Sequence, residues 1–356
     1  MENRVERMRN FFAENKIEAL LVTSDRNRQY LSGFTGTTGY LLITEKEALF
    51  FTDFRYLEQA KEQSPHFTVI DNRRKMLESV AEEVKKRGLK HIGFEENHVT
   101  YGEYKSWLSR MEGVDWVPTA GLVEQLRLLK DEGEIQKIRK AAEIADSAFA
   151  HILAYIKPGV TENEVALELE YTMRKLGASA PSFDTIVASG YRSAMPHGRA
   201  SNKKIETGEL VTLDFGAVYE GYVSDMTRTV AVGEISPKLH EIYRVCLEAQ
   251  QKGVEELGPG MTGQEADALC RDYITSRGYG EAFGHATGHG IGLEIHEGPT
   301  LSLNSEIILQ PGMVVTVEPG IYLPGVGGVR IEDDLLITED GSEIITKSKK
   351  ELIQLG

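Results

Sequence analysis

Cysteine is scarce in this sequence, and long apolar runs are missing from it. Cys246 and Cys270 are the only cysteines among 356 residues, too few for a disulfide framework, which fits a reducing compartment. No apolar run reaches the length that crosses a bilayer. The opening segment MENRVERMRNFF alternates charged and apolar residues, so it lacks the apolar core of a signal peptide. We therefore expect a soluble, cytoplasmic protein.

Basic residues are outnumbered by acidic ones. The chain has 40 Lys and Arg against 55 Asp and Glu, which gives a net charge of −15. Nucleic acids and anionic membranes would repel such a surface, so we expect neither as a partner. A surplus of acid also keeps ordinary globular proteins in solution, so the charge alone indicates no function.

The length of 356 residues exceeds what one hydrophobic core usually serves, so two domains are expected. The first 120 or so residues have the mixed pattern of an α/β domain. A helix is expected over Met76–Arg87, ending at Gly88. Residues 39–44 and 47–52 predict a hairpin, and residues 19–23, 67–70 and 92–94 predict further strands.

A long amphipathic helix is expected after this first domain. Apolar residues recur at steps of three and four from Ile135 to Ile156, and Lys157-Pro-Gly159 should end the helix. We interpret this stripe as core packing.

The rest of the chain contains an internal repeat. Lys157-Pro-Gly-Val-Thr161 with Glu164 recurs as Gly258-Pro-Gly-Met-Thr262 with Glu265, an offset of 101 residues. Each copy continues through a helical stretch to a glycine, Gly177 or Gly278. Further on, residues 211–216 (VTLDFG) match 315–320 (VTVEPG), and 221–225 match 328–332. Several matches in the same order predict two similar α+β halves packed face to face.

Each half carries two carboxylates on segments with strand character, Asp214 and Asp225 in the first and Glu318 and Glu332 in the second. Burying an unpaired acid costs several kcal/mol, so acids on apolar strands require a reason. The repeat would bring all four together, and roughly four negative charges would match two divalent cations. Any one of these acids could instead sit in a surface turn or salt bridge, but their matching places in the repeat favour a dinuclear site.

Histidine is concentrated in one glycine-rich stretch, residues 284–296, which contains His285, His289 and His296. The spacing of the first two is that of a helical zinc pair, but the HExxH pattern is absent and the glycines disfavour a helix. The glycines at 288, 290 and 292 hint only weakly at a nucleotide loop, because no clear strand–turn–helix context surrounds them. The stretch is better explained as part of the metal site. His197 alone is ambiguous between a structural and a functional role.

Five segments together resemble the pita-bread metallopeptidases: LDFG (213–216), GYVSDMTRT (221–229), GHATGHGIGLEIHEGP (284–299), VVTVEPGIY (314–322) and GVRIEDD (328–334). Within them the chain is similar to the proline-specific branch, and NRQYL (27–31), TDFRY (52–56) and LRLLKD (126–131) extend the likeness over nearly the whole chain. The resemblance implies an α+β protein of two domains. Residues 1–124 would form an α/β creatinase-type, ribonuclease H-like domain, and residues 125–356 a pita-bread catalytic domain with a pseudo-two-fold repeat.

The resemblance also implies a set of site residues. The metal ligands would be Asp214, Asp225, His289, Glu318 and Glu332. The groups acting on substrate would be Glu318, His296, His197, His285 and Arg330. Glu318 would accept the proton of the attacking water, His296 would stabilise the oxyanion, and His197 would help to hold the substrate.

By resemblance, the activity is that of an Xaa-Pro dipeptidase, which hydrolyses the bond before proline in dipeptides or short peptides. Two divalent ions are expected, with Mn²⁺ favoured over Co²⁺, Zn²⁺ and Fe²⁺ by the oxygen-rich ligand set. Aminopeptidase P, which cuts the same bond in longer peptides, is the nearest alternative. Creatinase-type hydrolysis and a non-catalytic pita-bread binding protein are more remote, because both would be expected without the five ligands. The family suggests a homodimer.

Overall fold

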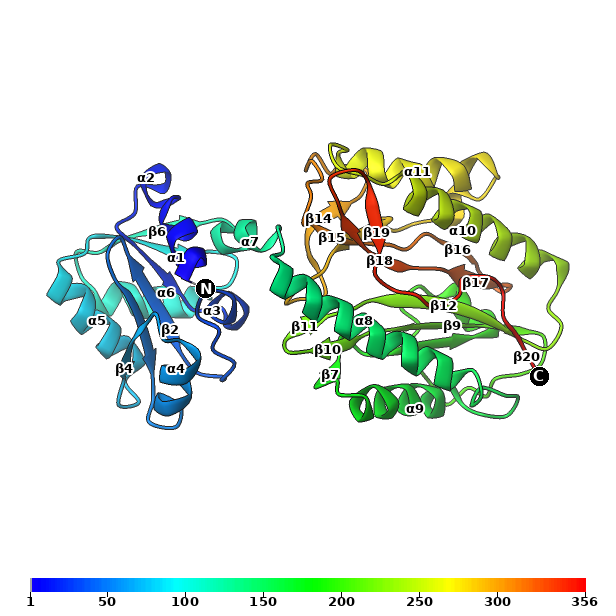
Figure 1. Ribbon diagram of the computed structural model, residues 1–356, viewed down its shortest axis with the longest axis horizontal. Coiled ribbons are helices and arrows are strands. Elements are labelled where there is room, and N and C mark those ends of the chain that lie inside the picture. The colour runs from blue at the N-terminus through cyan, green and yellow to red at the C-terminus, as the bar shows by residue number, and fades with distance from the viewer. Residues whose placement is uncertain (1) are drawn as a thin grey trace. The chain divides into compact units, whose positions relative to one another are not determined.

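The computed structural model describes residues 2–356. The chain divides into two compact units, residues 1–127 and 128–356, which Figure 1 colours from blue to red along the sequence. The domain boundary that we expect after residue 124 stays a prediction.

The first unit is built on one six-stranded sheet with the strand order β4-β3-β2-β1-β5-β6. Its strands are β1 (Ala19–Val22), β2 (Tyr40–Thr44), β3 (Ala48–Thr52), β4 (Thr68–Asp71), β5 (His91–Glu95) and β6 (Asp115–Thr119). Its helices are α1 (Glu2–Arg9), α2 (Phe12–Asn15), α3 (Asp25–Ser32), α4 (Leu57–Gln63), α5 (Met76–Arg87), α6 (Tyr101–Arg110) and α7 (Leu122–Arg127). Strand β2 runs antiparallel to both neighbours, and the other pairs are parallel. The predicted hairpin is therefore confirmed as β2–β3, and α5 ends at Gly88, which has a φ of 65°.

The start of α3 is held by a buried acid of the same unit. Glu95 accepts hydrogen bonds from the backbone N–H of Thr23 at 2.7 Å and of Ser24 at 2.9 Å. It also accepts one from Asn27 Nδ2 at 2.7 Å. Burial raises the pKa of Glu95 despite these donors. The carboxyl group of Glu95 thus lies at the positive, N-terminal end of α3. Asn27, from the NRQYL segment, has a structural role in this contact.

The second unit contains the two halves of the repeat. The first half comprises α8 (Glu132–Ile152), α9 (Glu162–Lys175), β7 (Ala180–Pro181), β8 (Ile186–Ser189), the 3₁₀ turn η1 (Gly190–Ala194), β9 (Glu209–Phe215), β10 (Ala217–Tyr219), β11 (Tyr222–Val223) and β12 (Met226–Val232). The second half comprises α10 (Pro237–Glu256), α11 (Gly263–Ser276), η2 (Gly280–Ala282), β13 (Gly288–Gly290), β14 (Glu297–Leu301), β15 (Val314–Val317), β16 (Gly320–Leu323), β17 (Gly327–Arg330), β18 (Asp333–Ile337) and β19 (Ser342–Ile344). A last short strand, β20 (Gln354–Leu355), pairs with β12.

The two halves form a layered structure with strands in the middle. Helices α8 and α9 lie on one side of the strands, and α10 and α11 lie on the other (Figure 1). One apolar core joins α8 and α9 to β9 and β12, and two others join α10 and α11 to the strands of the second half. The two larger sheets have the orders β20-β12-β9-β8 and β14-β13-β15-β18-β19, and two smaller sheets have the orders β11-β10-β7 and β16-β17.

The repeat found in the sequence is confirmed where the helices begin. Thr161 and Glu164 form a capping box at the start of α9, and Thr262 and Glu265 form the same box at the start of α11. In both copies the residue after the capping threonine pairs with a later loop through its backbone. Glu162 N–H donates to Lys203 O, and Gly263 N–H donates to Ile307 O.

The end of α8 differs from the prediction. The helix ends at Ile152, four residues before the last apolar residue of the stripe, although Ile156 is buried as expected. The N–H groups of Ala154 and Tyr155 bond back three residues, to His151 O and Ile152 O. The chain tightens into a turn before Lys157-Pro158, because a residue that precedes proline disfavours helical geometry.

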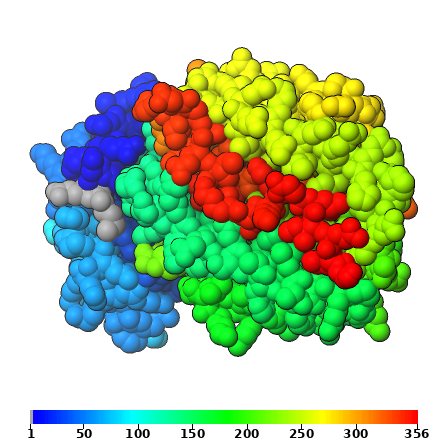
Figure 2. Space-filling model, turned by 45° about the vertical axis from the view of Figure 1, so that its right-hand side comes forward, coloured from blue at the N-terminus to red at the C-terminus, as the bar shows by residue number. Residues whose placement is uncertain are grey.

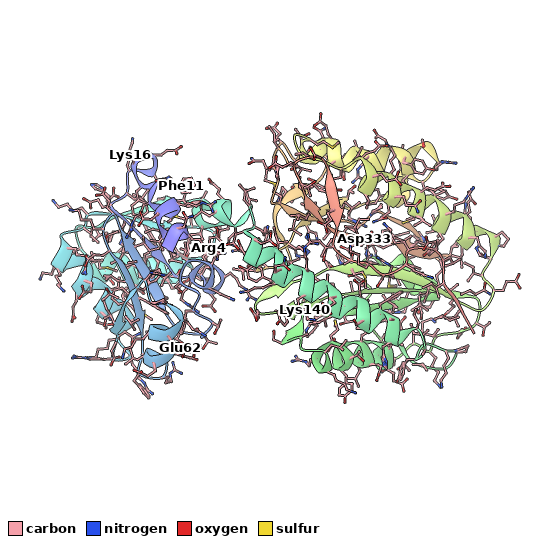
Figure 3. The ribbon with its side chains drawn as sticks, viewed as in Figure 1. Arg4, Phe11, Lys16, Glu62, Lys140 and Asp333 are labelled. Atoms are coloured by element: carbon pink, nitrogen blue, oxygen red, sulfur yellow. The ribbon has the colours of Figure 1, made fainter. Side chains whose placement is uncertain are left out.

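The C-terminal segment lies across the surface of the second unit, where Figure 2 shows it as a red band between α8 and α10. Asp146 of α8 accepts hydrogen bonds from the backbone of Lys347 and Ser348, and Tyr243 of α10 donates to Lys350 O. Asp333 lies inside the unit (Figure 3). It accepts from Arg228 at 2.7 Å and from Lys350 at 2.6 Å, which ties the segment to the interior.

Candidate metal centre

Strand pairing brings the four predicted acids to the middle of the second unit. Strands β9 and β12 are antiparallel, and Asp214 faces Thr227, two residues beyond Asp225. Strands β15 and β18 are also antiparallel, and the pair Val317 and Asp333 places Glu318 and Glu332 next to each other. Asp214 lies within β9 and Asp225 directly precedes β12, whereas Glu318 directly follows β15 and Glu332 directly precedes β18.

These segments surround a cavity of about 460 Å³. All nine residues proposed from the sequence line it: His197, Asp214, Asp225, His285, His289, His296, Glu318, Arg330 and Glu332. The structure thus brings together every candidate, including the ambiguous His197, from segments that are far apart along the chain.

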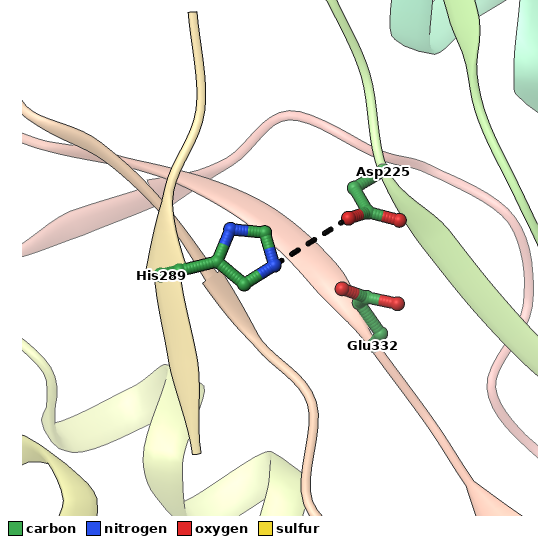
Figure 4. Close-up of side chains that lie close together, drawn as sticks. All are labelled: Asp225, His289 and Glu332. Atoms are coloured by element: carbon green, nitrogen blue, oxygen red, sulfur yellow. Dashed lines mark ion pairs between the residues drawn. The ribbon is translucent and has the colours of Figure 1, made fainter. Parts of the chain in front are cut away.

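Asp225, His289 and Glu332 are the tightest group (Figure 4). Each offers one ligand atom, and these three atoms lie within 4.8 Å of one another. His289 Nε2 is 3.7 Å from Asp225 Oδ2 and 3.3 Å from Glu318 Oε1. Nδ1 of His289 faces Gly290 O at 3.1 Å, and this contact requires the proton on Nδ1. In neutral His289, Nε2 is then free to bind a cation.

The carboxyl groups of the centre have shifted pKa values. Burial, followed by the negative charge of neighbouring acids, raises the pKa values of Asp225 and Glu332 well above their usual range. Burial also raises the pKa of Asp214, although Arg330 opposes the shift. At Glu318 burial acts in the same direction, but the hydrogen bond and charge of His289 outweigh it and lower the pKa. While no cation is bound, the charged forms of Asp214, Asp225 and Glu332 are therefore disfavoured.

Several carboxylate oxygens of this centre lack a hydrogen-bond donor among the described residues. They are Asp214 Oδ1, Asp225 Oδ1 and Glu332 Oε1, all buried. A buried acceptor without a partner costs free energy, so each of these oxygens needs a proton or a cation. The donor set of carboxylates and one imidazole suits divalent metal ions, and the orphaned oxygens show that the residues present fit them.

Arg330 connects the acids to the histidines. Its Nη2 donates to Asp214 Oδ2 at 2.6 Å and its Nη1 to Tyr322 Oη at 2.8 Å. Its Nε donates to Thr227 Oγ1 at 3.2 Å, and Thr227 in turn donates to Glu332 Oε2 at 2.5 Å. Arg330 is buried, with an exposed fraction of 3%. Its guanidinium group therefore holds two proposed ligands in place.

Tyr322 is a site residue that the sequence did not reveal. Its hydroxyl accepts from Arg330 and lies 2.8 Å from Nε2 of His285. Nδ1 of His285 faces Ala286 O at 2.8 Å, so Nδ1 carries the proton and Nε2 accepts from Tyr322. Burial lowers the pKa of His285, which agrees with a neutral ring. No spacing rule marks Tyr322, because its partners are Arg330 on β17 and His285 in the loop before β13.

Asp334 is a second residue that the sequence analysis passed over. Its Oδ2 accepts from the backbone N–H of Asp225 at 2.9 Å, and its Oδ1 has no hydrogen-bond donor among the described residues. Burial raises its pKa well above the usual range. The side chain of one half thus holds the backbone of a proposed ligand in the other.

His296 and His197 face the cavity from two loops. The ring of His296 packs edge-on against that of His289, with ring centres 4.5 Å apart. Burial lowers the pKa of His296. His197 lies in the loop that joins β8 to β9. Both histidines reach the cavity as expected, and neither belongs to the tight group of possible ligands.

A buried acid anchors the loop of His197. Glu162 is fully buried and accepts from the N–H and hydroxyl of Ser189 at 2.7 and 2.9 Å. It also accepts from the N–H and hydroxyl of Ser201 at 3.1 and 2.6 Å, and from Arg192 Nε at 3.0 Å. One side chain at the start of α9 therefore fixes both ends of the segment that carries His197.

A different acid anchors the histidine stretch of the second half. Asp267, inside α11, is fully buried and accepts from Thr287 N–H at 2.9 Å. It also accepts from Arg271 Nη2 at 2.8 Å, and Arg271 donates to His285 O at 2.7 Å. These bonds fix the backbone between His285 and His289.

The glycines of the histidine stretch allow close packing of strands. A Cβ atom on Gly288 would lie 1.9 Å from Thr316 O, and one on Gly290 would lie 2.0 Å from Gly298 O. Both residues belong to strand β13. The weak hint of a nucleotide loop is therefore wrong, as is a helical zinc pair, because His289 lies on a strand.

Comparison with known proteins identifies the family. Residues 136–339 match the model of metallopeptidase family M24, and residues 4–129 match the creatinase/prolidase N-terminal domain. The chain belongs to metallopeptidase family M24. Its two domains have the mixed α/β content that the resemblance predicted, and family membership implies the use of divalent metal at the centre described above.

Relatives of this M24 metallopeptidase match it along its length. The Xaa-Pro dipeptidase of Pyrococcus horikoshii is 43% identical over 99% of both chains. The solved structure of an Xaa-Pro dipeptidase from Bacillus anthracis is 56% identical over 99% of both chains, with a TM-score of 0.98. The structure of an X-Pro aminopeptidase from Thermotoga maritima is 42% identical, with a TM-score of 0.91, over 96% of this chain and 98% of that one.

A search of the described helices found none that combines the length and the apolar character of a membrane span.

Proposed function

We propose that this M24 metallopeptidase is an Xaa-Pro dipeptidase that hydrolyses the bond before proline. The observation that supports it most strongly is the convergence of nine residues from both halves on one cavity whose buried acids have orphaned oxygens. The names of the relatives from Pyrococcus horikoshii and Bacillus anthracis support the substrate class. A cavity of about 460 Å³ suits a small ligand such as a dipeptide.

Two divalent ions would be held by the five proposed ligands: Asp214, Asp225, His289, Glu318 and Glu332. We propose Mn²⁺ as the physiological metal, because four carboxylates and one imidazole form a mostly hard ligand set, which also admits Co²⁺, Fe²⁺ or Zn²⁺. When bound, such ions supply a water of lowered pKa and polarise the scissile carbonyl group.

Glu318 is the proposed general base. It lines the cavity with its Oε1 3.3 Å from Nε2 of His289, where its carboxylate would accept a proton from the attacking water. His296 lies beside His289 and would donate a hydrogen bond to the oxygen that becomes negative. The neutral ring of His285 accepts a hydrogen bond from Tyr322 and would direct its dipole towards the same region of the substrate. Arg330 would keep Asp214 and, through Thr227, Glu332 in their places.

The cavity also offers a place for the proline ring. Phe183, Pro196 and Ile295 are apolar residues of its lining. The amide before proline has no N–H group, so a pocket shaped for the ring can select it without providing an acceptor for that bond. His197, next to Pro196, would hold the proline side of the substrate.

Aminopeptidase P activity is the alternative that a specific observation favours. The relative from Thermotoga maritima is named an X-Pro aminopeptidase and is about as similar as the dipeptidase from Pyrococcus horikoshii. Creatinase-type hydrolysis and a purely binding role are less well supported, because the complete set of acids would then have no use.

The test compares an Xaa-Pro dipeptide, such as Ala-Pro, with an Xaa-Pro-Xaa tripeptide, such as Ala-Pro-Ala. Protein stripped with chelator should be inactive, and Mn²⁺ should restore hydrolysis of both. We expect a higher kcat/KM for the dipeptide. A higher value for the tripeptide would indicate aminopeptidase P, and full activity in protein verified to lack metal would contradict the metallopeptidase mechanism.

We further propose a cytoplasmic homodimer. Both cysteines are buried free thiols, which suits a reducing compartment. Analytical ultracentrifugation of the full chain measures the assembly, and a mass near the 39.6 kDa of one chain would contradict the dimer.

A further inference from the structure

A dipeptide substrate carries a negative carboxylate one residue beyond the bond that is cut. In the cavity proposed to receive it, two divalent ions would be matched by the charges of the four acids, which leaves no surplus positive charge for that group. Selective binding of a dipeptide therefore requires a positive group in the cavity that the acids do not already use. A role for such a group in binding the substrate rests on the proposed function.

Arg199 and Arg330 are the two residues with a permanent positive charge among the described residues that line the cavity. Arg330 is buried, and its Nε, Nη1 and Nη2 already donate to Thr227, Tyr322 and Asp214. Moving it to a substrate would leave those partners unsatisfied. Arg330 is therefore occupied by its partners at the metal centre and is not available to bind the substrate carboxylate.

Arg199 is held in a different way. Among the described residues its side chain forms an ion pair with Asp184 alone, with Nη2 and Oδ2 3.0 Å apart, and the two side chains are 76% and 70% exposed. An ion pair this exposed is screened by water and contributes little to stability, so a substrate carboxylate can replace Asp184 at little cost. A guanidinium group also fits a carboxylate with two parallel hydrogen bonds.

The backbone of Arg199 is fixed although its side chain is not. Arg199 forms an isolated antiparallel bridge with Ile186 at the start of β8. Its carbonyl oxygen accepts from Arg192 Nη2 at 2.6 Å, and Arg192 is itself held by Glu162. His197, two residues earlier, lines the same cavity. The loop thus fixes the backbone position from which the side chain of Arg199 reaches the cavity, three residues after Pro196 of the proposed proline pocket.

We infer that Arg199 binds the C-terminal carboxylate of the dipeptide, with Asp184 occupying the guanidinium group until substrate arrives. Arg199 then determines specificity for free dipeptides over substrates whose proline carboxylate is blocked. It takes no part in the chemical step, so it should affect KM more than kcat.

The experiment compares Ala-Pro with Ala-prolinamide, which has the same scissile bond and no carboxylate. In the Mn²⁺-loaded protein, Arg199→Gln should raise KM for Ala-Pro about tenfold, with kcat nearly unchanged and the amide unaffected. Arg199→Lys should restore part of the loss. Asp184→Asn should lower KM for Ala-Pro alone. Arg139→Gln, which breaks the Arg139–Glu343 surface pair outside the cavity, is the matched control and should change neither substrate.

Equal effects of Arg199→Gln on both substrates, or no effect on either, would overturn the inference. If the wild type hydrolyses neither substrate, the proposed function fails, and binding still tests Arg199. Calorimetry should then show that wild type binds L-proline more tightly than L-prolinamide and that Arg199→Gln removes the difference. Equal binding of the two ligands by wild type would also contradict the role of Arg199.

Discussion

The two halves of the second unit have the same backbone plan but use different side chains to support the metal centre. Both begin their second helix with the same capping box and the same backbone pairing to a loop. In the first half Glu162, directly after the capping threonine, anchors the histidine loop. The corresponding residue in the second half is Gly263, where a Cβ atom would lie 2.2 Å from Thr300 O.

The second half instead anchors its histidines from inside the helix, through Asp267. Its place in the repeat corresponds to Ala166 of the first half, which packs in the core. The fold therefore fixes where each loop must be anchored, while the residue that anchors it differs between the halves. The halves also divide the ligands unequally, since only the second contributes a histidine to the tight group.

The largest expected effect tests whether the halves are equivalent at the centre. Asp225→Asn and Glu332→Gln occupy matching places, so both should lose bound metal and reduce kcat/KM by at least about 10³-fold, the effect of losing several kcal/mol of transition-state stabilisation. Elemental analysis and kinetics of both variants provide the measurement. Asp272→Asn, an exposed acid on α11, is the control. Two metals per chain in either variant would remove that residue from the proposed ligands.

The next prediction separates the two loop histidines. His296→Ala should keep its metals and lose about 10²–10³-fold in kcat, because one donor to the oxyanion is removed. His197→Ala should instead raise KM more than it lowers kcat, since His197 is placed on the substrate side. Melting temperature, metal content and kcat should be measured on the same preparation. Normal kcat in a stable, metal-loaded His296→Ala protein would show that His296 has no part in the chemistry.

A third prediction compares the two anchors. Glu162→Gln and Asp267→Asn should each lower the free energy of unfolding by about 3 kcal/mol, because each leaves donors around a buried site without their charged partner. Glu162→Gln should also raise KM for Ala-Pro, whereas Asp267→Asn should reduce metal affinity. Urea denaturation, kinetics and metal titration measure the three effects. Identical functional defects in the two variants would contradict the separate roles of the loops.

The smallest expected effect concerns protons. Raised pKa values at Asp225 and Glu332 mean that the folded, metal-free protein binds more protons than the unfolded chain. These two protonated acids therefore stabilise the folded, metal-free protein fully below the ordinary carboxylate pKa. This stabilisation decreases as the pH rises towards neutrality. Between about pH 5 and 8, the metal-free wild type should lose stability relative to an Asp225→Asn Glu332→Gln variant.

Binding of Mn²⁺ should reverse this loss and release protons. Calorimetric titration in two buffers of different ionisation enthalpy measures that release. Metal uptake without any proton release at pH 6 would show that the acids are already ionised.

The sequence predicted the elements and the candidate residues of the site well, because the repeat and the apolar periodicity carry information over short distances. Helix α5 and the β2–β3 hairpin are close to their expected bounds. Helix α3 was missed, since it depends on Glu95, 71 residues from Ser24. Tyr322, Asp334, Glu162 and Asp267 were missed for the same reason. Their roles come from partners on other elements, and neither composition nor spacing marks such pairs.

The bonds that close the metal centre join residues far apart along the chain. Asp225 and Asp334 are separated by 109 residues, Thr227 and Glu332 by 105, and Arg330 and Asp214 by 116. Such contacts form late in folding, because closing long loops is slow. A partly folded chain with only one half in place would offer two acids and little affinity for metal. Metal would therefore stabilise only the completed domain, so that its uptake slows unfolding without guiding the early steps of folding.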